Sequence, residues 1–336
     1  MAKSNALNIA EPLAAPKLTF SKSSLRKVAP LLVLLLLSAL ISVVNPNFAD
    51  SANIIRLLSA AAIPTVLVMG ATFVILMGSI DLSVEGIVAV TAVLVSVLVL
   101  NDHTSMQFGL LAVPVAVLLG AAVGAVNGTL HVKLRSPSFM TTLGVGFACV
   151  GAATAFLAGD TVRIQDRAFR GFLALDRYAG IPASVWIAAM AVLVAWVIQE
   201  RTRVGRWVYA LGGDEEIARH VGVPIARTRI QAFTIAGAFS GLGGVLSAAQ
   251  LGQAHALISQ GRLFTAITAV VVGGTSLGGG VGSVLNSVVG VLIVVVLANG
   301  MVLMGVPSYV QQGVKGLLII AAVALALDRS RLGIVK

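Results

Sequence analysis

Ten long apolar stretches, separated by short polar segments, follow one another along the chain. A helix needs roughly 20 predominantly apolar residues to cross the hydrocarbon core of a bilayer. A helix also satisfies its own backbone hydrogen bonds, which lipid cannot do. The pattern therefore predicts an all-α polytopic membrane protein with about ten transmembrane helices. The expected spans are residues 29–44, 57–78, 82–100, 108–130, 139–158, 183–199, 229–251, 263–281, 284–303 and 309–327.

The composition is also that of a membrane protein. Of the 336 residues, 58% are hydrophobic and 11% are charged, whereas about 25% of residues in soluble domains are charged. The mean hydropathy is +0.99. We expect a single transmembrane domain over residues 29–327, with an N-terminal tail at 1–28 and a C-terminal tail at 328–336.

The net charge of +10 indicates membrane topology rather than a nucleic-acid surface. With both termini in the cytoplasm, 16 of the 23 Lys and Arg residues fall in cytoplasmic segments, as the positive-inside rule requires. A nucleic-acid interface needs cations gathered on one face of a soluble domain. The longest cytoplasmic segment between spans, residues 200–228, is too short to form such a domain.

Polar residues interrupt the apolar pattern between the second and third spans. Asp81, Ser83 and Glu85 stand at this joint, and ionisable groups inside a membrane are costly unless they have a role. One interpretation makes Asp81 the N-cap of the third span, with Glu85 adding favourable charge in its first turn. The other places Asp81 on a solute path or gate at a helix break near 78–86. The two interpretations are compatible.

The glycine-rich segment Gly273–Gly282 predicts a second helix break, near 273–283. It lacks the Gly-Lys-Ser/Thr ending of a Walker A motif, which occurs nowhere in the chain. We interpret its glycines as a tight joint between membrane helices, as in transporters with discontinuous helices. We therefore expect no ATP hydrolysis by this chain.

The longest cytoplasmic loop carries the signals of a short, well-capped helix. Asp214 follows two glycines and suits an N-cap position. Glu215 and Glu216 then fall in the first turn, where the helix dipole favours anions. Gly222 suits the left-handed position that follows a helix end. These signals predict a helix of two turns from Glu215 to Val221.

Four motifs, in the same order along the chain, resemble those of the membrane subunits of ABC importers for ribose, xylose, arabinose and related sugars. Asp81–Gly86 is similar to the D-L-S-V-x-G signature of this family, and Gly205–Gly222 to its G-R-x-x-Y-A-x-G-G-N loop, with Asp214 in place of Asn. The resemblance extends over roughly residues 48–330. The other two motifs are Asn127–Gly144 and Ala269–Gly282.

The resemblance implies a permease subunit of the bacterial inner (plasma) membrane that forms the path for a sugar. An extracytoplasmic binding protein would deliver the sugar, and a separate ATPase subunit would bind ATP and magnesium, so this chain itself would need no cofactor. A second permease copy would complete the path, as a homodimer. The implied translocation or gating residues are Asp81, Ser83, Glu85, Asn127 and Asn299. The implied ATPase-coupling residues are Asp214, Glu215, Glu216, Ala218, Arg219 and Gly222.

Two positions depart from the family pattern. Glu85 stands where Gly is common, and Val150 stands where many relatives carry Arg. Both lie in or near the predicted bundle, so both bear on the solute and on gating.

The largest external loop, residues 159–182, combines basic and acidic side chains. One interpretation is a solvated loop with local ion pairs. The other is that its arginines meet carboxylates of a soluble binding protein and fix its orientation. These arginines are Arg163, Arg167, Arg170 and Arg177.

Two other functional classes share part of this pattern. A branched-chain amino-acid ABC permease has similar hydropathy, and a secondary transporter or channel would need no ATPase. The capped loop helix disfavours the latter, as does the lack of carboxylates in the middle of the predicted helices. The four histidines lie far apart in the sequence, whereas a metal site needs three or four converging ligands. We expect neither a metal site nor an intramembrane enzyme.

Overall fold

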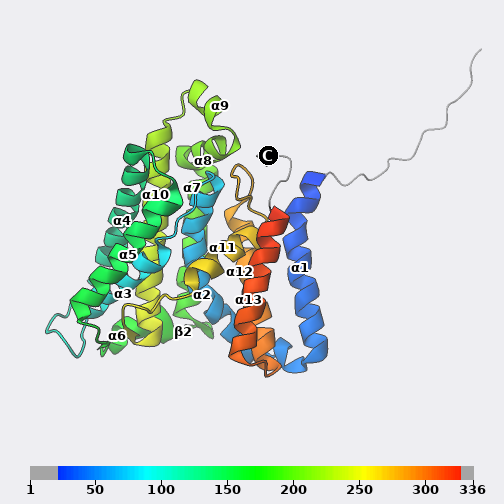
Figure 1. Ribbon diagram of the computed structural model, residues 1–336. Coiled ribbons are helices and arrows are strands. Elements are labelled where there is room, and N and C mark those ends of the chain that lie inside the picture. The colour runs from blue at the N-terminus through cyan, green and yellow to red at the C-terminus, as the bar shows by residue number, and fades with distance from the viewer. Residues whose placement is uncertain (1–21, 327–336) are drawn as a thin grey trace, which may run out of the picture.

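Long apolar helices make up most of the computed structural model, which describes residues 22–326 (Figure 1). The longer helices are α1 (Lys22–Val44), α2 (Ser51–Leu76), α3 (Val84–Leu98), α4 (Ala112–Leu134), α5 (Ser138–Leu157), α7 (Ala183–Arg201), α8 (Arg203–Gly213), α10 (Ile225–Leu251), α11 (Arg262–Val272), α12 (Val284–Leu303) and α13 (Ser308–Ala326). The short helical segments are η1 (Pro46–Ala49), η2 (Gly109–Leu111), α6 (Arg167–Arg170), η3 (Gly171–Leu175) and α9 (Glu215–His220). The strands are β1 (Val162–Arg163), β2 (Arg177–Tyr178), β3 (Ile181–Pro182) and β4 (Gln253–Ala254).

The strands form two small antiparallel pairs at one end of the bundle. Strand β1 pairs with β4, with Val162 opposite Ala254, and β2 pairs with β3, with Arg177 opposite Pro182. Figure 1 shows β2 and α6 at the end opposite to α8 and α9. We call α8 and α9 (residues 203–220) the arm, their end of the bundle the arm end, and the opposite end the far end.

Within residues 22–326, six helices are long and apolar enough to cross a membrane: α2, η2 continued by α4, α5, α7, α10 and α12. Each of the ten expected spans overlaps a helix, but two expectations are wrong in extent. Within the expected span 82–100 only α3 is helical, and within 263–281 only the part that belongs to α11 is helical. At a rise of about 1.5 Å per residue, these helices reach about 22 Å and 16 Å, which is less than the roughly 30 Å hydrocarbon core.

The predicted helix breaks are confirmed. Residues 77–83 connect α2 to α3, and residues 273–283 connect α11 to α12, both without helix. We call these segments the first break and the second break. In the second break, Gly274, Gly279, Gly280 and Gly282 all have positive φ. Its apolar composition made it look like part of a span, but its backbone cannot continue a helix.

The helices α2–α5 and α10–α13 form two repeats. Their lengths follow the same order, but the two repeats run in opposite orientations through the bundle. The first contains 26, 15, 23 and 20 residues and the second 27, 11, 20 and 19. Helix α2 ends at the arm end, where the Leu76 carbonyl accepts a hydrogen bond from Gly280, and α10 begins there, where Arg229 meets Glu215 of the arm. Inverted repeats with discontinuous helices are typical of transporters.

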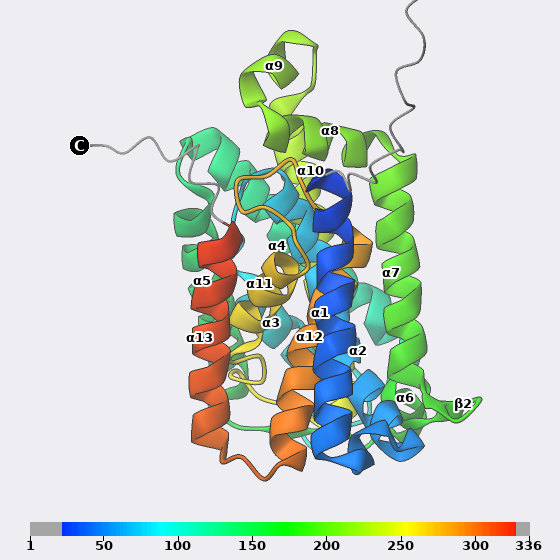
Figure 2. The same ribbon diagram turned by 90° about the vertical axis from the view of Figure 1, so that its right-hand side faces the viewer.

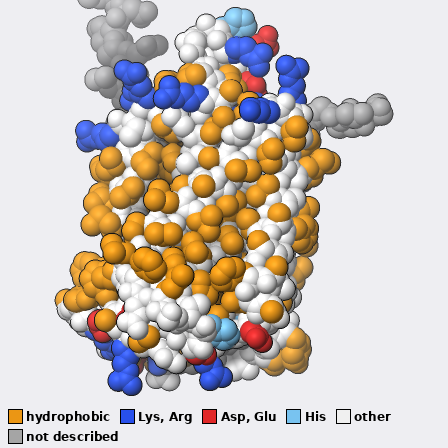
Figure 3. Space-filling view, turned by 90° about the vertical axis from the view of Figure 1, so that its left-hand side faces the viewer, with side chains coloured by type: hydrophobic (Ala, Val, Ile, Leu, Met, Phe, Trp, Pro, Cys, Tyr) orange, Lys and Arg blue, Asp and Glu red, His pale blue; other side chains and the backbone are white. Residues whose placement is uncertain are grey.

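Helices α2 and α10 form the centre of the bundle. In their most apolar windows, 78% of residues are buried, against 22% in the η2–α4 span and 28% in α5. Figure 3 shows the resulting outer surface: an apolar band between two rims that carry the charged side chains. The outer helices therefore present their apolar side chains to lipid or to another protein.

Glycines set the distance between α4 and α10. Gly120 and Gly124 of α4 face Gly237 and Gly241 of α10, and a Cβ on any of the four would overlap backbone atoms of the opposite helix. Small residues at intervals of four let membrane helices approach closely, where van der Waals packing replaces the hydrophobic effect.

The ends of the described chain lie together. Helix α1 begins, and α13 ends, at the same end of the bundle as the arm (Figures 1 and 2). Helix α1 begins at Lys22, seven residues before the expected start of the first span at 29. The rest of the expected N-terminal tail, residues 1–21, and the expected C-terminal tail, 328–336, lie outside the described residues.

The α4–α10 contact leads to a stability prediction. Gly237→Ala should lower the free energy of unfolding by about 1–3 kcal/mol, because the added methyl group overlaps the Gly120 carbonyl. The control is Gly151→Ala on the exposed side of α5, where no atom lies within 4 Å of the added Cβ. That change should leave stability equal or slightly higher, since Ala is the better helix former. Thermal unfolding of both variants in detergent checks this; equal losses would contradict the packing.

Candidate functional site

Hydroxyl groups of α5 hold the backbone of the first break. The Ser138 hydroxyl accepts a hydrogen bond from Ile80 N at 3.1 Å, and the Thr142 hydroxyl accepts one from Leu82 N at 2.9 Å. Non-helical backbone at membrane depth is stable only where protein or water satisfies its polar groups. Helix α5 therefore keeps the break open instead of allowing it to continue as helix.

Three of the predicted path residues meet at the start of α3. Asp81 Oδ1 accepts hydrogen bonds from Ser83 N at 2.8 Å and Ser83 Oγ at 2.6 Å, and Asn127 Nδ2 donates to Ser83 Oγ at 2.7 Å. All three residues are buried. Asp81 Oδ2 and Asn127 Oδ1 are buried and have no hydrogen-bond partner among residues 22–326. A buried carboxylate with one unpartnered oxygen is costly, which is typical of functional sites.

The expectation that Asp81 caps the third span is wrong. The N-cap of α3 is Ser83, which makes no side-chain cap bond. Asp81 instead closes a local turn just ahead of the helix, because its carboxylate reaches the Ser83 backbone N–H. Glu85 does lie in the first turn of α3, as predicted.

Glu85 joins the two half-length helices. Its Oε1 accepts a hydrogen bond from Leu263 N in the first turn of α11 at 3.1 Å, and its backbone carbonyl accepts one from Ser259 Oγ at 2.7 Å. The N-cap of α11 is Gly261, which offers no side chain for capping. Glu85 therefore supplies from α3 the acceptor and negative charge that the N-terminus of α11 favours.

Asn299 does not join this group. Its side-chain amide exchanges two hydrogen bonds with that of Asn53, at 3.0 and 3.2 Å. Asn53 lies in the first turn of α2, at the far end from the first break. Asn299 thus fastens α12 to α2, away from the Asp81 group, and its role in translocation or gating stays a prediction.

The arm contains the predicted capped helix. Asp214 Oδ1 accepts hydrogen bonds from Glu216 N at 2.9 Å and Ile217 N at 3.0 Å. The helix α9 spans Glu215–His220, one residue shorter than expected, and Gly222 has φ +80°. The side chains of Ile217 and Val221 are exposed, at 62% and 72%, and point away from the packed bundle, while Ala218 is buried.

An ion pair fixes α9 against α10. Glu215 Oε2 lies 2.7 Å from Arg229 Nη2, and Glu215 Oε1 lies 3.2 Å from Arg219 within the same helix. The two contacts use both carboxylate oxygens. Glu215 thereby sets the direction in which α9 leaves the bundle.

The arm also touches the end of α2, directly before the first break, and the second break through backbone. Gly212 of α8 packs on the Leu76 carbonyl and on Gly279 and Gly280 of the second break, where a Cβ would overlap backbone atoms. Gly280 N in turn donates a hydrogen bond to the Leu76 carbonyl at 2.8 Å. Three chain segments therefore meet at one point without intervening side chains.

Tyr209 adds a side-chain link from the arm to the second break. Its hydroxyl donates a hydrogen bond to the Gly282 carbonyl at 2.6 Å. Burial, with a smaller contribution from Glu200, raises the pKa of Tyr209 to about 12. The phenol therefore stays protonated, and a donor, at neutral pH.

A cleft of about 500 Å³ opens between these elements. It is bounded by the first break, by the α4–α5 turn and by the junction of α8 and α9 within the arm. Its polar lining includes Ser79, His131, Ser138, Asp214 and Arg229. The cleft brings the predicted coupling residues next to the first break.

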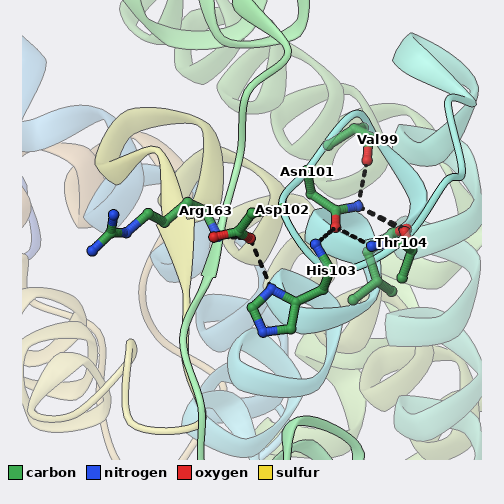
Figure 4. A network of polar contacts seen from close by, with 7 residues as sticks. Val99, Asn101, Asp102, His103, Thr104 and Arg163 are labelled. Carbon is green, nitrogen blue, oxygen red and sulfur yellow. Dashed lines mark hydrogen bonds and ion pairs between the residues drawn. The ribbon is translucent and has the colours of Figure 1, made fainter.

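At the far end, a polar network ties the α3–α4 loop to the 159–182 loop (Figure 4). Asn101 accepts from His103 N and Thr104 N, each at 2.7 Å, and Asp102 accepts from Arg163 N at 2.8 Å. The Arg163 backbone N–H, and then His103, lower the pKa of Asp102. A lowered carboxyl pKa stabilises this network at neutral pH, and the stabilisation is lost as the pH falls through that pKa.

The four arginines of the 159–182 loop differ in surroundings. The side chains of Arg163, Arg167 and Arg177 are exposed. Arg170 is half-buried and donates from Nε to the Ala249 carbonyl at 3.2 Å. Arg170 therefore anchors α6 to α10, and it is poorly placed to meet another protein.

Four residues of the site were missed from the sequence: Ser138, Thr142, Tyr209 and Arg229. Ser138 and Thr142 lie in the Asn127–Gly144 motif and Tyr209 in the Gly205–Gly222 motif, so the motifs contained a signal. Arg229 carried none, because its partner is 14 residues away.

The Ser83 contacts predict a large effect from a small change. Ser83→Ala should lower the free energy of unfolding by about 1–3 kcal/mol, because Asp81 Oδ1 and Asn127 Nδ2 lose a buried partner. The control is Ser247→Ala, equally buried, whose hydroxyl bonds only to the Gly243 carbonyl of its own helix. Ser247→Ala should lower the free energy of unfolding clearly less than Ser83→Ala. Denaturation in detergent measures both, and similar losses would rule out the network's contribution.

Comparison with known proteins confirms the family. The sequence model of a family described as "Branched-chain amino acid transport system / permease component" matches residues 53–323. Over 307 residues the chain is 35% identical to Ribose import permease protein RbsC of Escherichia coli K12, covering 90% of this chain and 94% of that protein. Two further relatives from the same organism are 33% identical: L-arabinose transport system permease protein AraH, over 92% of this chain and 93% of its own length, and D-allose transport system permease protein AlsC, over 89% and 91%.

No solved structure matches the chain. The family model and the relatives each cover most of the sequence, including both breaks and the arm. The chain therefore belongs to this family of permease components, in the part of it that holds sugar ABC importer permeases, and it is a multi-pass protein of the bacterial inner membrane.

Proposed function

We propose that the chain forms the transmembrane path of an ABC importer for a neutral sugar, a pentose, hexose or related polyol. One observation carries this proposal: relatives named for ribose, arabinose and allose transport align over about nine tenths of the chain, at 35%, 33% and 33% identity. The second candidate is a branched-chain amino acid, because the matching family is described by that solute. The relatives favour the sugar.

The arm is the proposed contact for a separate ATPase subunit, which binds ATP and magnesium and drives transport. Helix α9 projects from the bundle (Figure 2). Its exposed Ile217 and Val221 offer apolar anchors of the kind that dock in a groove. Asp214, Glu215, Glu216, Ala218, Arg219 and Gly222 shape this helix, and the arm end would then face the cytoplasm.

A second copy of the chain is the proposed partner within the membrane. Helix α3 packs on α5, and α11 packs on α13, so α5 and α13 border the two half-length helices. Gly144 of α5, and Gly313 and Gly316 of α13, have open space where a side chain would be. Such exposed small residues suit close helix packing between two copies. The path would then run between the copies, past α3 and α11.

Coupling follows from the contacts of the arm. Movement of the ATPase subunits would shift α9, and the rigid contacts of Gly212 and Tyr209 would pass this shift to both breaks. The first break holds Asp81 and Ser83, and Glu85 follows it in the first turn of α3, so movement of the breaks would change access from one side to the other. At the far end, the exposed Arg163, Arg167 and Arg177 are proposed to orient the binding protein.

Uptake into proteoliposomes tests the proposal. The complete complex of this chain, its ATPase and its binding protein should take up one sugar from a panel of sugars and branched-chain amino acids, and only with ATP. Uptake of a branched-chain amino acid, with no uptake of any sugar, would establish the second candidate. Uptake without ATP or the ATPase would mean a secondary carrier and would contradict the role of the arm.

The Glu215–Arg229 pair predicts a coupling defect. Arg229→Glu should reduce the sugar moved per ATP hydrolysed several-fold, because α9 loses its orientation while the ATPase remains active. The double variant Glu215→Arg with Arg229→Glu should restore part of that ratio, since the pair is re-formed. The control is Arg227→Glu, exposed and two residues away, which should leave the ratio unchanged. No rescue by the double variant would argue against the pair.

A further inference from the structure

The N-termini of α3 and α11 meet near the middle of the bundle. Glu85 lies 13 residues before the end of α3, which corresponds to about 20 Å from the far end. Leu263 is the second residue of α11, and the helix runs about 15 Å from there to the second break at the arm end. The hydrogen bond from Leu263 N to Glu85 Oε1 joins these two points. Both therefore lie at mid-depth of the expected membrane.

The chain just before α11 is exposed at this depth without being helical. Residues 255–261 form turns between β4 and α11, and Gln260 and Gly261 are exposed. Non-helical backbone at membrane depth occurs only where it is buried in protein or lines a water-filled cavity. Lipid therefore does not cover this segment.

Three side chains of different chemistry belong to Glu85 and to the chain neighbours of its partners Ser259 and Leu263. Phe264, in the first turn of α11, is 58% exposed. Gln260 is exposed, and its amide makes no hydrogen bond to residues 22–326. Glu85 is half-buried and uses only Oε1 in the bond to Leu263, which leaves Oε2 as an acceptor. The two half-length helices next to this group have outer neighbours, since α3 packs on α5 and α11 packs on α13.

We propose that Gln260, Phe264 and Glu85 form a solute contact site at the crossing of α3 and α11, which receives a neutral polyhydroxylated molecule. This inference rests on the proposed function and names where the sugar touches the chain. The Phe264 ring offers an apolar face for C–H groups of a sugar. The Gln260 amide both donates and accepts, and Glu85 Oε2 accepts from hydroxyl groups.

The charge at the site sets the class of solute. Two helix N-termini would attract an anion, but Glu85 already occupies that position on α11 with its carboxylate. A sugar acid or sugar phosphate would meet this carboxylate and be repelled. A neutral sugar meets only a few polar groups, so it is held weakly, which suits a path that must also release it.

Cysteine accessibility tests the location. The chain has one cysteine, Cys149, so Cys149→Ala gives a background free of thiols. Gln260→Cys and Phe264→Cys in this background, reconstituted with the ATPase and binding protein, should react with a membrane-impermeant maleimide in at least one nucleotide state. The control Leu118→Cys, at a 69% exposed position on α4, should not react. The transported sugar should slow labelling of Gln260→Cys several-fold, and a sugar acid should not.

Labelling of Gln260→Cys no faster than that of Leu118→Cys, in the nucleotide-free, ATP-bound and vanadate-trapped complexes, would overturn the site. Such a result together with normal sugar uptake would leave the proposed function intact. If the cysteine variants are labelled but the unmodified complex takes up no sugar, the proposed function is contradicted, whereas the site remains accessible to water. The two failures are therefore distinguishable.

Transport measurements test the contacts themselves. Gln260→Leu and Phe264→Leu should each lower the sugar moved per ATP hydrolysed about tenfold, the factor expected for one lost contact of this kind. ATPase activity stimulated by the binding protein should persist. The matched controls Gln107→Leu and Phe108→Leu, exposed at the far end, should keep the normal ratio. An unchanged ratio in both site variants would refute the proposal.

Discussion

The meeting of three backbones at the arm end is the constraint on which the rest of the structure depends. Gly212 of α8 packs on the Leu76 carbonyl and on Gly279 and Gly280, and Gly280 N donates to that carbonyl. No side chain separates the arm from the end of α2 or from the second break at this point. Protein packed this closely has little compressibility, so a displacement of the arm is passed on rather than absorbed.

Polar groups inside the bundle serve the breaks that this junction controls. Ser138 and Thr142 satisfy the backbone of the first break, and Glu85 satisfies the first turn of α11. Each is supplied by a different helix from the one it serves. The breaks therefore persist only in the folded bundle, and a shift between helices changes their hydrogen bonds directly. Discontinuous helices of this kind are how transporters place polar groups at mid-depth.

Local chemistry made part of this structure predictable from sequence. The cap of α9 is decided within nine residues by Asp214 and Gly222, and it was predicted almost to the residue. The extent of α11 was not, because the glycines that end it are as apolar as the helix. Asp81 closes a turn instead of capping α3 because its carboxylate reaches the Ser83 N–H two residues ahead. The contact of Asn299 with Asn53 could not be predicted, because the two residues are 246 positions apart in the sequence. Hydropathy reports burial in lipid but says nothing about which buried polar groups meet.

The central claim is that the arm and the second break move as one body. Spin labels at Arg206→Cys on α8 and Gly278→Cys in the second break, in the Cys149→Ala background, report this distance; both positions are exposed. Doubly labelled chain diluted with unlabelled chain gives the distance within one copy, and chain labelled only at residue 278 gives the distance between copies. On ATP binding, the first distance should stay constant while the second changes. A change in the first distance with no change in the second would contradict the account.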